Sequence, residues 1–320
     1  MSNNINDNIL LVGLGFMGKE YHKVLSGMGV EYTAVGRGSK RTEEFIALTG
    51  HHAYSGGIDE YVAKHGMPHT RAILAVQAEY GAECAVKLLK AGIKQLLVEK
   101  PCGLNEQQMD AIIDEAQRNN AKVVVGYNRR FYAAVMAAEK IIKEDGGVTS
   151  VCYDFTEKGF KDDESVEGLL VGNSSHVIDL AFWLGGLPKE MRSYSNIDTN
   201  PDTVRVEFSG AGVTEKDALF SYIANWKAPG RWSVEVMTAK HKLIFRPMEK
   251  LQIQDLGSFA IREDESVDYS LDTEYKHGVY REVETFLSDI DNSRLLTIEG
   301  QRKHLDYYFM IARGKELRHA

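Results

Sequence analysis

The first 126 residues alternate short apolar runs with helix-length segments, and this alternation constrains the fold more than any other feature. The apolar runs have the length of strands and lie at 9–12, 32–35, 71–76, 94–98 and 122–125. Helical patterning follows at 19–28, 40–49, 82–91 and 106–119, with Ser39 and Asn105 as expected N-caps. Uninterrupted apolar runs are typical of parallel strands buried on both faces. The sequence therefore predicts an α/β fold that begins with a doubly wound parallel sheet.

Three glycines separate the first apolar run from the helix that follows it. They form the pattern Gly13-x-Gly15-x-x-Gly18, with Phe16 and Met17 between the last two. The first glycine permits a tight turn, the second lets a pyrophosphate approach the backbone, and the third allows close helix–strand packing. The helix N-terminus adds free N–H groups and a partial positive charge. These five residues are predicted to bind a dinucleotide; the competing interpretation is a glycine-rich turn that only packs.

The residues after the second apolar run distinguish between two dinucleotides. An acid at this position binds the ribose hydroxyls of NAD. Here Gly36 is followed by Arg37, Lys40 and Arg41, and no acid occurs between positions 31 and 43. Guanidinium groups bind the 2′-phosphate of NADP, which a carboxylate would repel. The pattern favours NADP(H) over NAD(H), unless these cations are simply the solvated start of a helix.

The fourth apolar run ends in Glu99-Lys100-Pro101. Open α/β sheets bind ligands at the carboxyl ends of their strands, so Lys100 is predicted to lie beside the cofactor, where an amine can hold, donate or accept a proton. Glu99 and Pro101 are expected to border the same site. The alternative for Lys100 is a surface lysine that pairs with Glu99.

The character of the chain changes after Gly126. Period-two patterning at 150–157, 203–209, 218–226, 233–238 and 242–245 predicts strands. Helical segments are expected at 131–145, 176–184, 279–289 and 298–313. Many strands with few helices predict that residues 127–320 form an α+β domain with a largely antiparallel open sheet, after a first domain at 1–126.

Composition excludes several classes of function. The net charge of −8 argues against a nucleic-acid partner, and every apolar run is too short to span a membrane. The N-terminus lacks the basic flank and apolar core of a signal peptide. Three cysteines and ten histidines show no disulfide framework and no metal-ligand spacing. We therefore expect no metal site. We expect a reducing, cytoplasmic location.

Four motifs together resemble the Gfo/Idh/MocA family, the glucose–fructose oxidoreductase and inositol dehydrogenase type of enzyme. They are the glycine pattern at 13–18, Glu99-Lys100-Pro101, Asn128-Arg129-Arg130-Phe131 and His176-x-x-Asp179, and the resemblance runs from about residue 8 to 314. It implies a Rossmann domain, then an α/β domain whose open sheet makes a dimer or tetramer. It also implies a nicotinamide cofactor, a sugar, inositol or sugar-nucleotide substrate, and often a cis peptide bond before the proline.

The resemblance implies roles for individual residues. Lys100 binds the reacting hydroxyl or carbonyl and assists proton transfer, and His176 contacts a substrate hydroxyl. His176 is otherwise a satisfied histidine at a helix start, and Asp179 either orients the site or pairs with a nearby base. Asn128 and Arg130 match a segment that faces the substrate; the alternative for Arg129 and Arg130 is an interdomain salt bridge.

Two departures from the family pattern stand out. Many members have an aspartate four residues before the histidine, where this chain has Gly172 followed by Asn173. An amide can orient a substrate but cannot act as a carboxylate base, so a Lys–Asp–His relay is in doubt and Asn173 is expected to bind substrate. In the loop that borders the nicotinamide, many members have Thr-Pro where this chain has Val76-Gln77.

Two tryptophans, Trp226 and Trp232, flank a predicted hairpin. Tryptophans cover sugar faces, but paired tryptophans at a hairpin are more often packing or oligomer contacts.

The sequence thus predicts an NADP(H)-preferring oxidoreductase that interconverts a secondary alcohol and a ketone on a sugar or polyol. The rival is a nucleotide-binding sensor or regulatory subunit without turnover. A further alternative is reduction of an acyclic or aromatic substrate.

Overall fold

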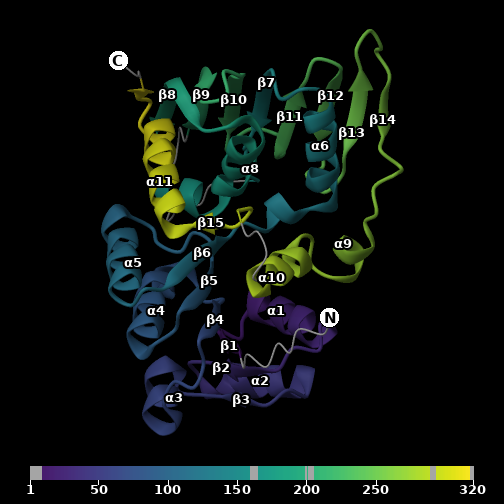
Figure 1. The fold of residues 1–320 in the computed structure, drawn as a ribbon. Helices are drawn as coiled ribbons and strands as arrows, with labels where there is room; N and C mark the ends of the chain where they lie inside the picture. The colour runs from purple at the N-terminus through teal and green to yellow at the C-terminus, as the bar shows by residue number, and fades with distance from the viewer. Residues whose placement is uncertain (1–8, 159–164, 199, 201–204, 289–292, 318–320) are drawn as a thin grey trace. The chain divides into compact units, whose positions relative to one another are not determined.

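The structure is a computed structural model that describes residues 9–158, 165–198, 200, 205–288 and 293–317. The chain divides into two compact units. Unit 1 comprises Met1–Asn128 and Glu274–Lys303, and unit 2 comprises Arg129–Thr273 and His304–Ala320 (Figure 1).

Unit 1 is built on a seven-stranded sheet in the order β15-β6-β5-β4-β1-β2-β3. All neighbouring strands are parallel except β15, which pairs antiparallel with β6. The strands are β1 (Ile9–Val12), β2 (Tyr32–Val35), β3 (Ala53–Tyr54), β4 (Arg71–Leu74), β5 (Gln95–Glu99), β6 (Lys122–Gly126) and β15 (Leu296–Thr297). The predicted parallel, doubly wound sheet is confirmed.

Helices cover both faces of this sheet. They are α1 (Phe16–Gly27), α2 (Ser39–Thr49), α3 (Gly57–His65), α4 (Ala78–Ala91), α5 (Glu106–Arg118) and α10 (Val279–Leu287). Figure 1 shows α4 and α5 together on one face and α1 with α10 on the other.

The two predicted helix caps had different outcomes. The side chain of Asn105 accepts a hydrogen bond from the N–H of Gln108 at 3.0 Å, which confirms it as the N-cap of α5. The cap at Ser39 was wrong, because Ser39 is the first residue of α2 and Gly38 is its N-cap.

Residues 274–303 return to unit 1, so the units differ from two consecutive domains at 1–126 and 127–320. Three interactions explain the return. Helix α10 packs on α1, the guanidinium of Arg71 donates to the carbonyl of Leu287 at 3.1 Å, and Leu296 in β15 pairs with Val125 in β6. All three join residues more than a hundred positions apart, which local patterning does not reveal.

Unit 2 contains a nine-stranded sheet in the order β14-β13-β12-β11-β7-β10-β9-β8-β16. The strands are β7 (Ser150–Asp154), β8 (Pro188–Asp198), β9 (Arg205–Thr214), β10 (Leu219–Asn225), β11 (Ser233–Met237), β12 (His241–Phe245), β13 (Gln252–Asp255), β14 (Ile261–Glu263) and β16 (Glu316–Leu317). Among the described strands of this sheet, only β7 and β10 pair in parallel, so the predicted largely antiparallel sheet is confirmed. Sequence patterning missed β8, because most of its residues are polar.

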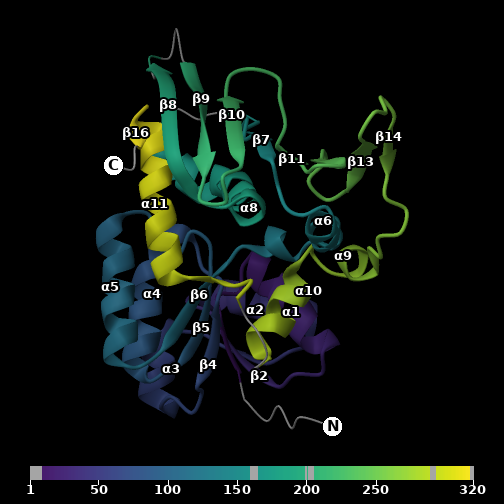
Figure 2. The ribbon, with the colours of Figure 1, turned by 45° about the horizontal axis from the view of Figure 1, so that its top comes forward.

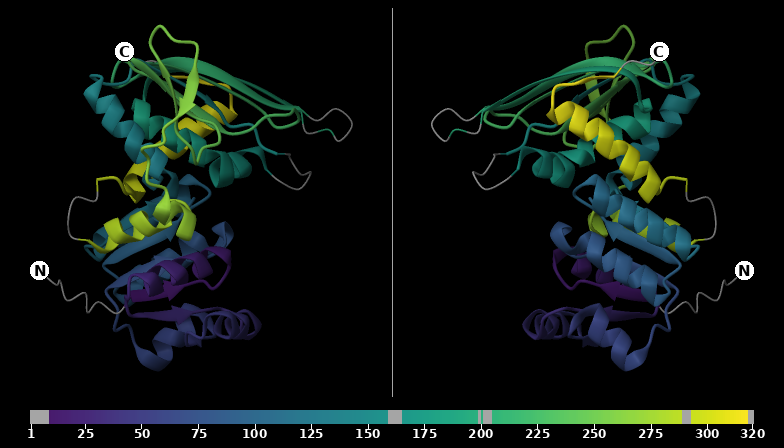
Figure 3. Two further views of the ribbon diagram at one scale, coloured as in Figure 1. Left: turned by 90° about the vertical axis from the view of Figure 1, so that its right-hand side faces the viewer. Right: turned by 90° about the vertical axis from the view of Figure 1, so that its left-hand side faces the viewer.

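The helices of unit 2 lie against one face of this sheet, and no described helix covers the other (Figures 2 and 3). They include α6 (Ala133–Glu144), α7 (Val166–Leu169), α8 (Ser175–Gly185) and the later turns of α11 (Ile298–Ala312), whereas the short helix α9 (Ser270–Glu274) lies beyond β14 in the chain. A 3-10 turn, Asn128–Phe131, precedes α6, so that helix begins two residues later than predicted. The carboxylate of Asp272 accepts the N–H of Ala133 at 2.7 Å.

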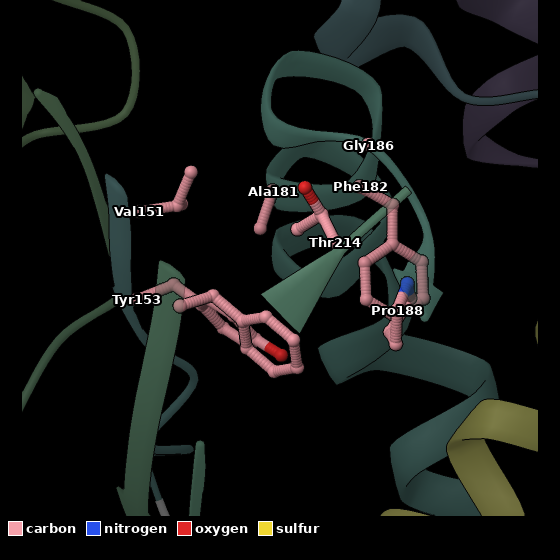
Figure 4. Close-up of a pocket in the computed structure, with 8 residues that line it drawn as sticks. Val151, Tyr153, Ala181, Phe182, Gly186, Pro188 and Thr214 are labelled. Atoms are coloured by element: carbon pink, nitrogen blue, oxygen red, sulfur yellow. The ribbon is translucent and has the colours of Figure 1, made fainter. Parts of the chain in front are cut away.

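A small apolar recess lies between α8 and the sheet (Figure 4). Its lining residues are Val151, Tyr153, Ala181, Phe182, Gly186, Pro188, Thr214 and Phe220. None of these side chains is charged, so the recess is a feature of helix–sheet packing.

No helix in the described part of the chain has the length and apolar character needed to cross a bilayer.

Candidate active site

Five strands of unit 1 end within one residue of a common row. Val12 pairs with Val35 on one side and with Leu74 on the other, and the row continues through Val98 to Val125. The loops that carry the predicted cofactor residues therefore leave the sheet from one carboxyl edge. Ligands of open α/β sheets bind at this edge.

The three glycines of the first loop serve different purposes. Gly13 has a φ of +101°, and a Cβ on it would lie 2.3 Å from the carbonyl oxygen of Ala75. A Cβ on Gly18 would lie 1.9 Å from the carbonyl oxygen of Gly13. Gly15 has a φ of −78°, and a Cβ there would meet nothing within 4 Å. Packing explains the first and third glycines, whereas Gly15 keeps open a space that the protein does not fill.

The start of α1 faces this loop. Phe16 and Met17 belong to its first turn, in which no described side chain caps an N–H group and no acid occurs. A helix start with uncapped N–H groups and no negative charge is suited to a phosphate. Together with the space at Gly15, this arrangement fits the pyrophosphate of a dinucleotide.

The cations after β2 lie where the sequence placed them. Arg37 follows the end of β2, and Lys40 and Arg41 are exposed in the first turn of α2, which contains no acid. The Arg37 guanidinium lies 4.5 Å from the centre of the Tyr80 ring. Sequence reasoning missed Tyr80, because its approach to Arg37 depends on how α4 packs.

The loop after β4 lies against the glycine loop. A Cβ on Gly13 would be 3.1 Å from a methyl carbon of Val76, and Gln77 is the N-cap residue of α4. The sheet register thus brings Val76 and Gln77 to the edge that also carries Gly13.

A buried acid–tyrosine cluster lies beside Lys100. The hydroxyl of Tyr21 donates to Glu99 at 2.7 Å and lies 3.4 Å from a carboxylate oxygen of Glu282. Burial raises the pKa of Glu99, against the opposing effects of Tyr21, Lys100 and Lys276. Burial and the two carboxylates raise the pKa of Tyr21 well above its ordinary value. Lys100 itself is half-buried and precedes Pro101 through a cis peptide bond.

Tyr21 and Glu282 have no sequence signal. They come from α1 and α10, which are 261 positions apart at this contact. Asn128 is also held within unit 1, because its side-chain amide donates to the carbonyl of His277 at 2.9 Å.

Arg130 and Asp179 form a buried ion pair in unit 2. Arg130 Nε lies 2.8 Å from one oxygen of Asp179, and Nη2 lies 2.5 Å from the other. Burial opposes ionisation of Asp179, but the Arg130 charge and the nearby His304 ring, whose Nδ1 lies 3.4 Å from Oδ1, outweigh it, so the pKa of Asp179 is lowered. Arg130 therefore forms a salt bridge, although within unit 2 and not between domains, and Asp179 pairs with a nearby base.

His176 is the second residue of α8 and is buried. Its ring centre lies 6.3 Å from that of Trp232, and the Arg129 guanidinium lies 4.9 Å from the Trp232 ring. Trp226 is only 1% exposed and belongs to the core. Of the two tryptophans, therefore, the half-buried Trp232 is the one beside a predicted site residue.

Asn173 lies in a π-helical turn, Leu170–Ser174, that runs directly into α8. Its side-chain amide donates to Glu157 at 2.8 Å. Across the described ranges, no three His, Cys, Asp or Glu side chains are grouped to hold a metal ion.

The fold and the glycine loop define the class: a Rossmann-fold protein with a dinucleotide-type loop. Residues 8–127 match the model of the Gfo/Idh/MocA family, described as an oxidoreductase family with an NAD-binding Rossmann fold. This match confirms the resemblance seen in the sequence, over the Rossmann-fold part of the chain, and supports a nicotinamide-dependent oxidoreductase in general terms.

Solved structures share the fold over nearly the whole chain. A levoglucosan dehydrogenase in complex with NADH superposes with a TM-score of 0.76 at 18% identity, covering 97% of this chain and 98% of that one. A UDP-N-acetylglucosamine 3-dehydrogenase from Acidithiobacillus ferrooxidans gives 0.74 at 16%, covering 96% and 97%. An oxidoreductase from Desulfitobacterium hafniense, described as NADPH-dependent, gives 0.77 at 18%, covering 98% and 96%. At such identities the likeness concerns the fold alone.

The Arg130–Asp179 pair yields a prediction about stability. Arg130→Met leaves a buried carboxylate without its cation, so the free energy of unfolding should fall by about 3–5 kcal/mol in urea titrations at pH 7. Adding Asp179→Asn should recover part of this loss, because the uncompensated charge is then gone. A loss below about 1 kcal/mol for the single variant, the size of an exposed pair, would contradict the assignment.

Proposed function

We propose that the chain is an NADP(H)-preferring oxidoreductase that interconverts a secondary alcohol and a ketone on a sugar, inositol or nucleotide-linked sugar. The observation that carries the proposal is the shared carboxyl edge, where the open loop at Gly15 follows β1 and Lys100 follows β5, with only β4 between these two strands. Levoglucosan and UDP-N-acetylglucosamine are the first substrates to test, because enzymes named for them share this fold.

The proposed chemistry assigns a proton to Lys100. A bound nicotinamide would supply hydride transfer at the carbinol carbon. As that carbon is oxidised its hydroxyl loses a proton, which the Lys100 amine accepts; in the reduction, the ammonium donates it. Glu99 precedes Lys100 in the chain, and the hydroxyl of Tyr21 holds the Glu99 carboxylate in place through a hydrogen bond of 2.7 Å. His176 is proposed to orient a substrate hydroxyl.

Replacing the amine tests this role. Lys100→Met keeps most of the side-chain volume but cannot exchange a proton, so kcat should fall about 10²–10⁴-fold with little change in the Kd of the cofactor. Steady-state kinetics on the best substrate of a sugar panel and fluorescence titration of NADPH give the two numbers. Lys94→Met, at the amino end of β5, is the matched control and should retain activity. An unchanged kcat in Lys100→Met would remove Lys100 from the mechanism.

The NADP preference rests on the cations after β2. Arg37 stacked on Tyr80, with Lys40 and Arg41 in the next turn, supports binding of a 2′-phosphate beside a planar surface.

Arg37→Ala should therefore weaken NADPH binding about tenfold to a hundredfold, the value of one charge-assisted contact. The Kd of NADH, which lacks the phosphate, should change by less than about threefold in the same titration. Equal losses for both cofactors would mean that Arg37 does not read the phosphate, and the NADP preference would fail.

A non-catalytic sensor is the second candidate, favoured by the absence of a side chain at Gly172 and by the altered loop at Val76–Gln77. Turnover distinguishes the two candidates, because a sensor binds the cofactor without oxidising or reducing it. Oxidation of NADPH or reduction of NADP⁺ with any sugar in the panel would eliminate the sensor.

We further propose that the uncovered face of the second sheet is a contact between copies of the chain. Tyr194, Leu219 and Ile223 project from this face and are 58%, 61% and 56% exposed. The register places Tyr194 and Ile223 in one row, on either side of Ser209, and Leu219 in a row with Val213. Apolar side chains gathered on one uncovered face are a feature of protein interaction surfaces.

Light scattering should therefore report a dimer or tetramer. Leu219→Lys with Ile223→Lys should shift it towards monomer, because each buried interface would then hold uncompensated charge. Phe259→Lys, at a fully exposed apolar residue outside these rows, is the control and should leave the mass unchanged. A monomeric wild type would contradict the proposal.

Two further proposals concern the binding partner and the cellular location. The net charge of −8 supports a small-molecule substrate over nucleic acid. The three cysteines are free thiols in the structure, which supports a reducing, cytoplasmic location.

A further inference from the structure

Unit 2 contains a buried carboxylate that sequence analysis did not single out. Glu157 lies three residues beyond the end of β7 and is 7% exposed. Its Oε2 accepts from the side-chain amide of Asn173 at 2.8 Å, and its Oε1 accepts from the hydroxyl of Ser174 at 2.5 Å. One carboxylate thus binds two consecutive residues of the turn that leads into α8 and His176.

The segment that presents Glu157 is itself held in place. The backbone N–H of Asn225 donates to the hydroxyl of Thr156 at 3.0 Å, and the indole N–H of Trp226 donates to the carbonyl of Phe155 at 3.3 Å. These two hydrogen bonds hold the backbone next to Glu157 in one position. A π-helical turn such as Leu170–Ser174 is a local departure from α-helix that is frequent at functional sites.

The contact with Glu157 decides which way the Asn173 amide points. Because Nδ2 is committed to the carboxylate, Oδ1 is directed to the other side of the amide and offers an acceptor. A carboxylate fixes this orientation since it can only accept, so a flipped amide would place two acceptors together. A Cβ on Gly172, the preceding residue, would meet nothing within 4 Å, so the space beside the turn is open.

We infer that Glu157 is a positioning residue for the substrate site of unit 2, where it supplies, from the segment that follows β7, the carboxylate that position 172 lacks. It fixes Asn173 Oδ1 as an acceptor for a substrate hydroxyl. The substrate class is a neutral polyhydroxylated ring, which donates hydroxyl protons to such an acceptor and packs on the neighbouring Trp232. The inference deepens the proposed function and rests on it.

Kinetics of three variants test the inference, with the sugar of highest kcat/KM among levoglucosan, myo-inositol, glucose and UDP-N-acetylglucosamine. Glu157→Ala and Asn173→Ala should each raise KM about three- to tenfold, the value of one neutral hydrogen bond, with the Kd of NADPH unchanged. The double variant should match Asn173→Ala alone, because Glu157 acts through Asn173. Multiplied effects in the double variant would overturn the inference.

Glu157→Gln separates positioning from charge. Its Oε1 can still accept from Asn173 while its Nε2 donates to the Ser174 hydroxyl, so KM should stay within about twofold of the wild type. If Glu157→Gln is as impaired as Glu157→Ala, the residue acts through its charge and the inference is wrong. Should Glu157→Ala fail to fold, Asn173→Asp replaces it, since opposing carboxylates there should also raise KM.

A readout without turnover keeps the two proposals distinguishable. The side-chain amide of Asn173, assigned by the loss of its resonance in Asn173→Asp, should give one slowly exchanging, shifted ¹H–¹⁵N pair. That signal should persist in Glu157→Gln and collapse to an ordinary exposed amide in Ser174→Ala with Glu157→Ala. If no sugar turns over, the proposed function fails while this spectrum still decides the contact. An amide unaffected by removal of Glu157 would overturn the inference.

Discussion

The register of the first parallel sheet is the constraint on which the rest of the structure depends. Because Val35, Val12, Leu74 and Val98 stand in one row, the loops that follow them begin at the same level. Loops from distant parts of the chain can then bring glycines, cations and an amine to a single edge. A shift of one residue in any strand would move its loop and turn its side chains to the opposite face.

Close packing at this edge explains two of the three glycines. It does not explain Gly15, which is therefore informative about the ligand. Gly13 and Gly18 allow backbone to approach backbone within distances that no Cβ tolerates. Gly15 has ordinary backbone angles and open space above it. Glycine loses more conformational entropy on folding than any other residue, so a glycine that the fold does not need lowers stability. A ligand that must approach the backbone at position 15 explains why a glycine is nevertheless present there. In unit 2, two buried polar contacts hold the segment that contains His176. The Arg130–Asp179 pair binds α8, and Glu157 binds the turn that precedes it.

The sequence predicted those features that are local or periodic. Apolar runs identified the parallel strands, the Asn105 cap followed from a side chain and the N–H three residues on, and the end of β5 located Lys100. Features that depend on distant pairing were not predictable. Tyr21 meets Glu282 and Arg71 meets Leu287 only after α10 has returned to unit 1. Glu157 has no motif, and its partners at 173 and 174 become visible only once the turn before α8 is formed. The error at Ser39 has a local cause: Gly38 already supplies the extended residue that precedes α2.

The central claim is that the space at Gly15 belongs to a dinucleotide, and titration of NADPH against wild type and Gly15→Val tests it most directly. The valine meets no protein atom at its Cβ and requires no unusual φ, so the melting temperature should stay within about 2 °C of the wild type. The Kd of NADPH should nonetheless rise about tenfold or more, because the side chain occupies the path of the pyrophosphate. Equal affinity in the two proteins would show that the loop does not cradle the cofactor, and the account of the site would be wrong.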